Sequence, residues 1–416
     1  MDPIPGWTDI KPYSENSNNT VWMVDADNYG AQPMVGDNIV VIGGTQYAGY
    51  PLYGFSATDG SMLWNITCPV MTKDGGAIGY GKWFTACEDL RFRCYDITNG
   101  QLLWTGDQGV YPYANFWHHS FGVAYNKLYA GSYDGHLYAF DVNTGKIVWN
   151  FFTGNTTETP YGTWPIWGSP VVADGKVYVS SGEHSSVSRP LSVERGHKLY
   201  CLDAETGDVI WSVPHYQTQF QGKAIANGYL IDSEEYSGMM YCFGKGQTAT
   251  TVSLQNNIVA KGSMVLIQGT ILDQSPGQKD TACVSKDSMS AWMEYLHWQL
   301  PVPTNTTGVP VTLLAIAPDG TVSTIGTATS DMSGIFVYPW TPSSEGLYKI
   351  TATFSGDDSY WDSWGETNLQ VTAGSSTSQA EITQTDNTPL LYGILVAVVA
   401  ALIVGLVAIF LTLRKR

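Results

Sequence analysis

Charged side chains are scarce in this sequence, and basic ones are especially few. Asp, Glu, Lys and Arg make up 14% of the 416 residues, against roughly 25% in an average soluble protein. The 37 Asp and Glu outnumber the 20 Lys and Arg, which leaves a net charge of -17. Such an acidic chain repels phosphate backbones, so we predict no nucleic-acid partner. The plentiful Gly, Trp and Tyr indicate a β-rich, loop-rich chain.

The N-terminus lacks the apolar segment of a signal peptide, because residues 1–20 are polar throughout. The sequence is therefore a fragment, a gene with a misplaced start or a tail-anchored protein, and we favour the fragment. The C-terminus differs, since residues 390–413 carry no charge and are followed by the basic tail 414–416. A helix of this length crosses the roughly 30 Å hydrocarbon core. We predict one transmembrane helix with the tail in the cytoplasm and the rest of the chain outside.

Motifs for catalysis and metal binding are also missing. There is no Gly-x-Ser-x-Gly elbow, and the His residues lack ligand spacing. The acidic clusters 232–235 and 357–362 do not fit an EF-hand loop, so we interpret them as turn residues. We therefore predict no catalytic, metal or cofactor residue. Four Asn-x-Ser/Thr sequons agree with an external location, at Asn18, Asn65, Asn155 and Asn305.

One short pattern recurs four times with fixed internal spacing. Its copies are PLYGFSATDGSMLW, LRFRCYDITNGQLLW, GHLYAFDVNTGKIVW and HKLYCLDAETGDVIW, which end at Trp64, Trp104, Trp149 and Trp211. Four residues before each Trp stands a glycine, at Gly60, Gly100, Gly145 and Gly207. Ten residues before it stands a small residue, and the degraded fifth copy MMYCFGKG has no Trp.

Each copy predicts a β-hairpin, with Asn-Gly or Thr-Gly in the turn and the Trp in the second strand. Two further strands precede each hairpin, and four strands make one propeller blade. We thus predict an all-β fold with a propeller over residues 30–246, after an N-terminal segment 1–29. Four to five blades are visible, so either the ring is small or further N-terminal sequence completes it.

The copy that ends at Trp149 resembles the repeat of the quinoprotein-like β-propellers, whose signature is a strand, Asp, Thr-Gly-Lys and a terminal Trp. The resemblance implies that the repeat Trp docks between adjacent blades. The family includes pyrroloquinoline-quinone dehydrogenases and also cofactor-free propellers such as the bacterial outer-membrane assembly lipoprotein. Those dehydrogenases carry an adjacent Cys pair, which this sequence lacks, and no Glu, Asn and Asp set for calcium can be placed.

A second pattern of short alternating strands fills residues 247–372 and predicts a β-sandwich. The run 308–372 resembles a bacterial immunoglobulin-like repeat, which implies display and not chemistry. Helical spacing over 287–300 predicts an inserted helix capped by Asp287 or Ser288, either packed on the sandwich or exposed to a partner. The Ser/Thr-rich stretch 373–389 predicts a flexible stalk.

Cysteines and aromatic loops supply the remaining candidates. Cys94, Cys201 and Cys242 occupy the small slot of the repeat and are interpreted as packing residues. Cys87 is a candidate for a disulfide with Cys94 across a hairpin, or with Cys68. Aromatic residues gather where consecutive blades begin, and they either pack the core or stack on a ligand, with Trp117, Trp164 and Trp167 as the stacking candidates.

The sequence therefore predicts a membrane-anchored, non-catalytic surface glycoprotein that resembles archaeal cell-surface proteins. Its propeller loops would bind a protein or polysaccharide partner. The alternative is a quinone-dependent oxidoreductase of the cell envelope.

Overall fold

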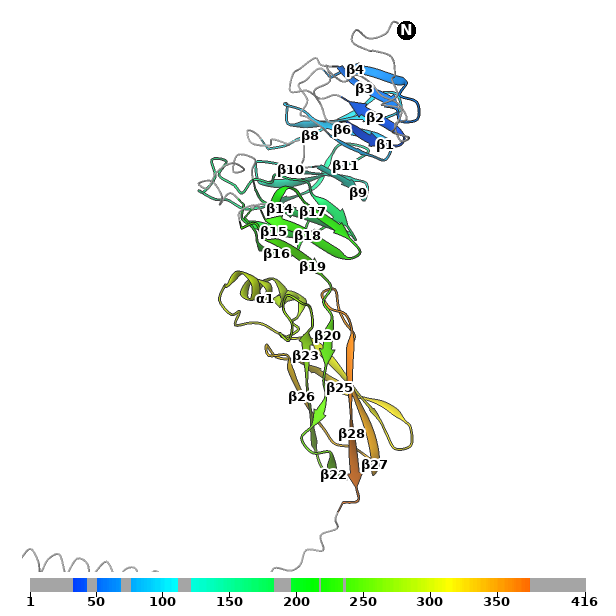
Figure 1. Cartoon of the computed structure of the whole chain (residues 1–416), viewed down its shortest axis with the longest axis vertical. Coiled ribbons are helices and arrows are strands. Elements are labelled where there is room, and N and C mark those ends of the chain that lie inside the picture. The colour runs from blue at the N-terminus through cyan, green and yellow to red at the C-terminus, as the bar shows by residue number, and fades with distance from the viewer. Residues whose placement is uncertain are drawn as a thin grey trace, which may run out of the picture.

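The computed structural model describes residues 33–42, 51–68, 76–110, 121–182, 196–216, 218–234 and 237–374. These residues form two β modules, one above the other, with a single helix between them (Figure 1). No helix in these ranges is long and apolar enough to cross a membrane. The predicted span 390–413 lies outside the described residues, as do Asn18, Trp117 and most of the stalk.

The first module consists of five antiparallel sheets that follow one another along the chain. The first and second sheets contain β1 (Met34–Gly36), β2 (Ile39–Ile42), β3 (Pro51–Ser56) and β4 (Met62–Thr67), then β5 (Ala77–Gly79), β6 (Lys82–Ala86), β7 (Arg91–Asp96) and β8 (Leu102–Gln108). The third and fourth contain β9 (Phe121–Ala124), β10 (Lys127–Gly131), β11 (His136–Asp141) and β12 (Ile147–Phe152), then β13 (Val171–Ala173), β14 (Lys176–Ser180), β15 (Lys198–Asp203) and β16 (Val209–Pro214). The fifth has three strands, β17 (Thr218–Ala226), β18 (Tyr229–Glu234) and β19 (Met240–Gly244).

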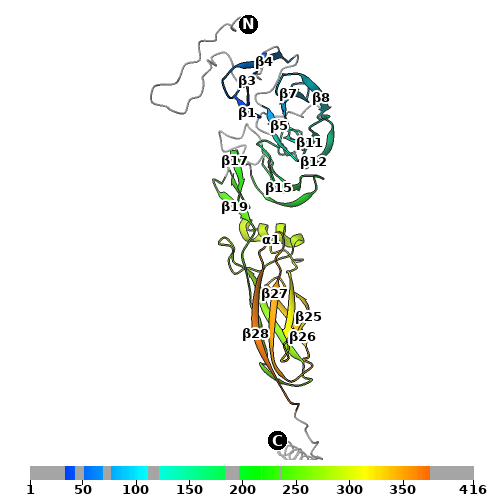
Figure 2. The ribbon, with the colours of Figure 1, turned by 90° about the vertical axis from the view of Figure 1, so that its right-hand side faces the viewer.

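The five sheets are arranged as propeller blades. The first strand of each sheet contacts the first strand of the next, in the order β1, β5, β9, β13 and β17. Figure 2 shows the sheets fanning around these inner strands. In the first four sheets the two middle strands are almost wholly buried, while the outer strand β8 of the second sheet alternates between buried and exposed residues. This pattern is expected when each sheet packs between two neighbours.

The strand register explains the small slot of the repeat. The residue ten positions before each Trp is its cross-strand partner, in the pairs Gly54–Trp64, Cys94–Trp104, Ala139–Trp149 and Cys201–Trp211. A Cβ atom on Gly54 would lie 2.1 Å from the indole of Trp64, so a bulky residue does not fit there. Cys242 occupies the same slot in the fifth sheet, but no outer strand is described there, and Cys242 is exposed.

The repeat indoles lie between neighbouring sheets, as the resemblance implies. The Nε1 atom of Trp64 donates to the carbonyl oxygen of Ile97 in the next sheet at 2.8 Å, and that of Trp104 donates to Val142 at 3.1 Å. Each indole also covers the turn glycine of the following sheet. Cβ atoms on these glycines would lie within 3 Å of the ring, in the pairs Gly100–Trp64, Gly145–Trp104 and Gly207–Trp149.

Replacing Gly145 by alanine is expected to lower the free energy of unfolding by about 3 kcal/mol. Its φ of +69° strains any other residue by about 1–2 kcal/mol, and its Cβ would lie 2.4 Å from the Trp104 ring, which adds about 1–2 kcal/mol. Gly175→Ala is the matched control, because Gly175 has φ +67° with no atom within 4 Å. Urea unfolding measures both variants, and equal losses would show that the Trp104 contact is unimportant.

The second module is a two-sheet sandwich. One sheet contains β20 (Thr248–Thr250), β21 (Ser253–Leu254), β23 (Val265–Asp273) and β26 (Ile335–Trp340), and the other contains β22 (Ile258–Ala260), β24 (Pro310–Ile316), β25 (Val322–Thr329), β27 (Gly346–Phe354) and β28 (Ser363–Thr372). Alternating residues of both sheets form one core, with Ile267, Leu313, Ile350 and Leu369 fully buried. The assignment to the immunoglobulin-like class stays a prediction.

Helix α1 (Lys286–Trp298) joins the two modules. Its N-cap is Ser285, so the prediction of a cap at Asp287 or Ser288 is wrong, and the left-handed conformation of Gln299 ends the helix. One face of α1 packs on the sandwich through Trp292, which is 5% exposed. The opposite face contacts the propeller, where Trp298 stacks on Tyr241 with ring centroids 5.2 Å apart. The helix is therefore a junction between the modules, and it covers the fourth and fifth sheets of the propeller (Figure 2).

Candidate functional site

The two ends of the propeller differ in their connections. At one end, which we call the turn end, the first two strands of every sheet are joined by a two-residue turn with positive φ at both positions, at Asp37–Asn38, Tyr80–Gly81, Tyr125–Asn126, Asp174–Gly175 and Asn227–Gly228. These are tight hairpin turns with little room for a ligand. The opposite end, the loop end, carries the longer connections, including 153–170 and 181–197. Function in such scaffolds concentrates on the loops.

Between the fourth and fifth sheets, the loop end contains a buried group of ionisable side chains. His215 follows β16, and Asp232 lies in β18; both are fully buried. The His215 Nε2 atom lies 3.3 Å from an Asp232 oxygen. Lys223 is the cross-strand partner of Asp232, and its Nζ donates to the Ser180 hydroxyl at 2.8 Å. A cation, a carboxylate and an imidazole thus meet across two sheets.

The surroundings set the charge of this group. Burial and then the positive charge of Lys223 lower the pKa of His215 to about 3, so the imidazole is neutral where it contacts Asp232. Burial also lowers the pKa of Lys223, while the Asp232 carboxylate opposes that shift. Lys223 and Asp232 therefore interact electrostatically beside the neutral His215.

The protein is expected to lose stability in mild acid through His215. An unfolded histidine titrates near 6.5, and His215 titrates near 3 in the folded protein. Between these values the unfolded chain binds one more proton, so the stabilisation is complete above pH 6.5 and is lost as the pH falls. The loss is about 2 kcal/mol between pH 6.5 and 5. Urea unfolding across this range measures it, and an unchanged slope in His215→Gln would contradict the assignment.

A second buried group lies at the same end, in the turn between β10 and β11. The Asp134 side chain is 5% exposed and accepts a hydrogen bond from the Tyr138 hydroxyl. That hydroxyl also accepts a hydrogen bond from the backbone amide of Val110 at 3.1 Å. Burial, followed by the Asp134 charge, raises the pKa of Tyr138. This group fixes the loop end of the third sheet.

The predicted stacking residues have different environments. Trp164 is half-buried and stacks on His197, with ring centroids 4.7 Å apart and an interplanar angle of 11°. Trp167 is 2% exposed and faces the interior. Trp164 is therefore the one described member of the set that is partly exposed, and it lies at the loop end. The sequons at Asn65, Asn155 and Asn305 are all exposed.

The acidic cluster 232–235 was misinterpreted at the sequence level, whereas Asp357 of the other cluster accepts the backbone amides of Ser359 and Tyr360 as a turn residue does. Asp232 is fully buried and Glu234 is 3% exposed, where a turn residue would be exposed. Glu234 accepts a hydrogen bond from the backbone amide of Tyr216 at 2.8 Å. In the described part of the chain, no three His, Cys, Asp or Glu side chains come together as a metal site. The described residues thus do not supply the calcium set of a quinoprotein.

The cysteines do not form the Cys87–Cys94 bridge. All six are free thiols in the structure. Cys94 lies opposite Trp104 within its sheet and is fully buried. The thiol of Cys87 instead makes a hydrogen bond with Cys68, the second partner that the sequence left open.

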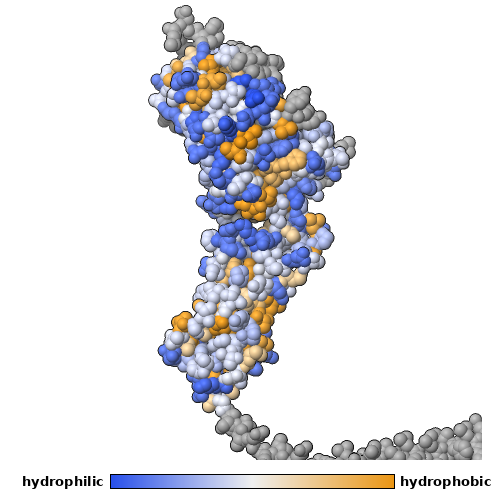
Figure 3. All heavy atoms as spheres, turned by 180° about the vertical axis from the view of Figure 1, so that it is seen from behind, coloured by the Kyte–Doolittle hydropathy of each residue, from blue (hydrophilic) through white to orange (hydrophobic). Residues whose placement is uncertain are grey.

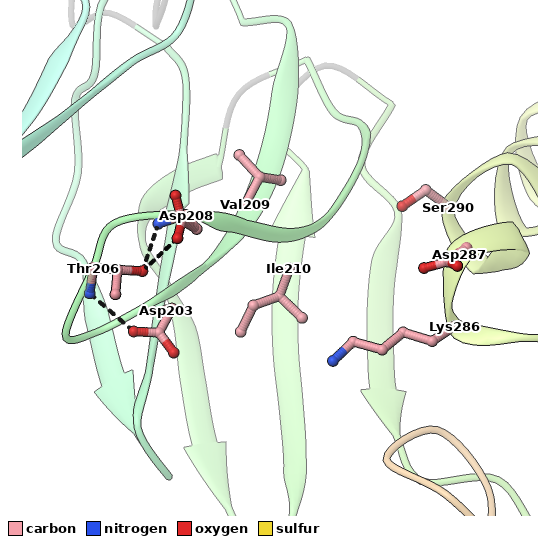
Figure 4. A pocket seen from close by; sticks show the side chains of 8 residues that line it. All are labelled: Asp203, Thr206, Asp208, Val209, Ile210, Lys286, Asp287 and Ser290. Atoms are coloured by element: carbon pink, nitrogen blue, oxygen red, sulfur yellow. Dashed lines mark hydrogen bonds between the residues drawn. The ribbon is translucent and has the colours of Figure 1, made fainter.

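An open cavity of about 550 Å³ lies away from these groups, between the β15–β16 turn and the start of α1 (Figure 4). The Asp203 carboxylate in its wall already accepts the backbone amides of Glu205 and Thr206 at 2.8 and 2.9 Å. Figure 4 shows Lys286 pointing into the gap from the helix, and its Nζ lies 3.4 Å from Asp358. The cavity is thus a gap between the two modules that is lined largely by polar side chains. Elsewhere, Figure 3 shows apolar residues in separate patches over both modules.

Comparison with known proteins connects this fold to one repeat family. The family model described as outer membrane protein assembly factor BamB matches residues 8–191. The chain carries a PQQ-repeat, BamB-like β-propeller. BamB of Yersinia pestis is 22% identical over 229 residues, which cover 50% of this chain and 49% of that protein. The crystal structure of BamB from Moraxella catarrhalis aligns with a TM-score of 0.38 and 14% identity, over 77% of this chain and 87% of that one.

Dehydrogenases share the same PQQ repeat at higher identity. Polyvinylalcohol dehydrogenase of Sphingopyxis sp. is 35% identical over 155 residues, which cover 30% of this chain and 24% of that protein. The dehydrogenase subunit of the quinone alcohol dehydrogenase of Gluconobacter oxydans is 31% identical over 161 residues, which cover 35% of this chain and 20% of the relative. The chain therefore spans a quarter or less of the length of these enzymes.

These relatives contradict the prediction that the chain is not an enzyme. That prediction was based on the absence of an adjacent Cys pair and of a calcium-binding set, which are features of a cofactor site. The residues of the PQQ repeat determine how the blades pack. Enzymes and cofactor-free propellers share this repeat, so the repeat does not distinguish between them. Identities of 31–35% to named alcohol dehydrogenases favour the oxidoreductase alternative over the non-catalytic reading.

Proposed function

We propose that the PQQ-repeat propeller takes part in quinone-dependent oxidoreduction outside the cytoplasm, with its loop end as the working face. The observation that carries this proposal is the 31–35% identity between about a third of this chain and alcohol dehydrogenases named as quinone-dependent or acting on polyvinyl alcohol. An alcohol is accordingly the substrate class. The chain spans a quarter or less of the length of those enzymes, so the activity is a proposal that the fold alone does not establish.

The charges at the loop end limit how a quinone could be held there. Pyrroloquinoline quinone carries carboxylates, which cations would balance in a chain of net charge -17. Lys223 and Arg93 lie at this end, but Asp232 faces Lys223, and Asp89 holds Arg93 through hydrogen bonds of 2.7 and 3.0 Å. When bound, the quinone would accept the electrons of the alcohol. The chain's own residues would bind and orient it, and the half-buried Trp164, which stacks on His197, lies at this end.

Dye-linked oxidation tests the proposal. The full chain, incubated with pyrroloquinoline quinone in a buffer that contains Ca²⁺, is expected to reduce an artificial electron acceptor when a primary alcohol is added, and the same chain without the quinone should not. Trp364→Ala is the matched control, because this Trp is 62% exposed on the second module and should leave the rate unchanged. Failure to reduce the dye, with a quinone dehydrogenase active in the same assay, would contradict the proposal.

A second candidate is a binding scaffold, which the junction at α1 favours. The helix holds the two modules together through Trp292 on one side and Trp298 on the other, as expected for a protein that presents its propeller at a distance. The partial likeness to an outer membrane assembly factor agrees with this role. Anchoring through residues 390–413, an immunoglobulin-like spacer and a protein or polysaccharide ligand belong to this candidate. It predicts retention on a glycan or protein array that falls when Trp164 becomes alanine.

A further inference from the structure

Two buried cysteines meet where the first blade packs on the second. Cys68 directly follows β4, the outer strand of the first sheet, and Cys87 directly follows β6 of the second sheet. Both are 2% exposed and belong to one core cluster with Trp64, Trp83 and Tyr95. The pair therefore lies beside the indole that docks the first sheet on the second.

The two thiols interact within this buried cluster. A hydrogen bond with the Cys68 thiol, followed by burial, raises the pKa of Cys87 above its ordinary value. The Tyr95 hydroxyl also makes a hydrogen bond with Cys68. On the other side Arg93 contacts Cys87, and its guanidinium is held by Asp89. This cation offsets part of the rise in the pKa of Cys87.

The other cysteines have different surroundings. Cys94 and Cys201 lie opposite repeat Trp residues in their own sheets, and Cys283 is in the core of the second module. Cys242 is exposed on β19. Cys68 and Cys87 are thus the described pair of thiols that interact across a blade boundary, within one buried cluster.

We propose that Cys68 and Cys87 are an oxidisable dithiol that forms a disulfide bond between the first and second blades. Two S–H bonds break and one S–S bond forms. The two electrons and two protons pass to a disulfide oxidant, which becomes a dithiol. Disulfides persist outside the cytoplasm, where this propeller is proposed to work. The bond would fasten the first sheet to the array at the position where Trp64 already docks.

Thiol counting by mass spectrometry tests the pairing. The full chain is treated with oxidised glutathione, denatured and alkylated without reductant. Four of the six cysteines are expected to be alkylated, and a peptic digest should contain one linked peptide pair that joins Cys68 to Cys87. Alkylation of all six, or a linkage through other cysteines, would overturn the proposal.

Thermal unfolding supplies a second measurement. Reduction of the oxidised chain is expected to lower its Tm by roughly 5–10 °C, because the bond restricts the unfolded chain. Cys68→Ser should abolish this dependence on reductant. Cys94→Ala is the matched control and should retain it, since Cys94 is buried in the same sheet as Cys87 but lies outside the pair. If Cys68→Ser does not fold, Cys87→Ala takes its place. Reductant dependence that persists in the Cys68 or Cys87 variant would contradict the assignment.

Discussion

Replacing Asp232 by asparagine is expected to lower the free energy of unfolding by about 3–5 kcal/mol. The carboxylate is fully buried between two sheets, 3.3 Å from His215 and across the strand pair from Lys223. The amide keeps the shape of the side chain but removes its charge, so the Lys223 ammonium is left without its counter-charge in a desolvated site. Breaking a buried charge pair on one side carries a cost of this size. Urea unfolding followed by Trp fluorescence measures the change.

A double variant separates the lost charge pair from a general disturbance of the core. Lys223→Met removes the cation, so Asp232→Asn combined with it leaves no unpaired charge. Most of the stability lost in the single variant should return, with a coupling energy of about 2 kcal/mol or more. If the stability losses of the two single variants simply add in the double variant, Lys223 and Asp232 act independently. This result would contradict the proposal that they form a charge pair at this end of the propeller.

Trp104→Ala is expected to cost about 3–5 kcal/mol. The indole is 9% exposed, donates to Val142 in the next sheet and covers Gly145 there. Alanine would leave a cavity at the boundary between the second and third sheets and an unpaired Val142 carbonyl oxygen. Trp364→Ala, at a site 62% exposed, serves as the comparison and should change stability by about 0.5 kcal/mol or less. Similar losses in both would contradict a structural role for the repeat indole.

The blades could be predicted from the sequence because their determinants are local. A turn glycine lies four residues before the Trp, and a small residue ten before, because the hairpin register puts the small residue opposite the indole. Each determinant lies within one short segment, so each copy of the repeat predicts its own hairpin without the other copies. The same glycine also contacts the indole of the preceding sheet, and predicting this contact requires only the neighbouring copy of the repeat.

The buried charges could not be predicted because their partners come from other segments. Asp232 and Glu234 resemble turn residues until β18 is placed between Lys223 of β17 and His215, which follows the fourth sheet. The Cys68–Cys87 contact joins two sheets in the same way. Helix α1 has apolar residues on both sides, and the sequence shows their spacing but not that the second side meets Tyr241 of the propeller.

Chemistry is harder to derive from this sequence than fold. The repeat encodes the packing of blades, which enzymes and cofactor-free propellers share, so repeats alone cannot separate them. The absence of a Cys pair and a calcium set led to a non-catalytic prediction that the dehydrogenase relatives contradict. The groups that distinguish the two roles would lie at the loop end, whose connections extend beyond the described residues.

Direct titration of pyrroloquinoline quinone into the full chain, with Ca²⁺ present, tests the proposed role most simply. Quenching of Trp fluorescence should saturate at one quinone per chain, and the control Trp364→Ala should titrate in the same way as the parent protein. A change that rises linearly without saturation, equal to that of free tryptophan, would contradict quinone binding and leave the scaffold as the function to pursue.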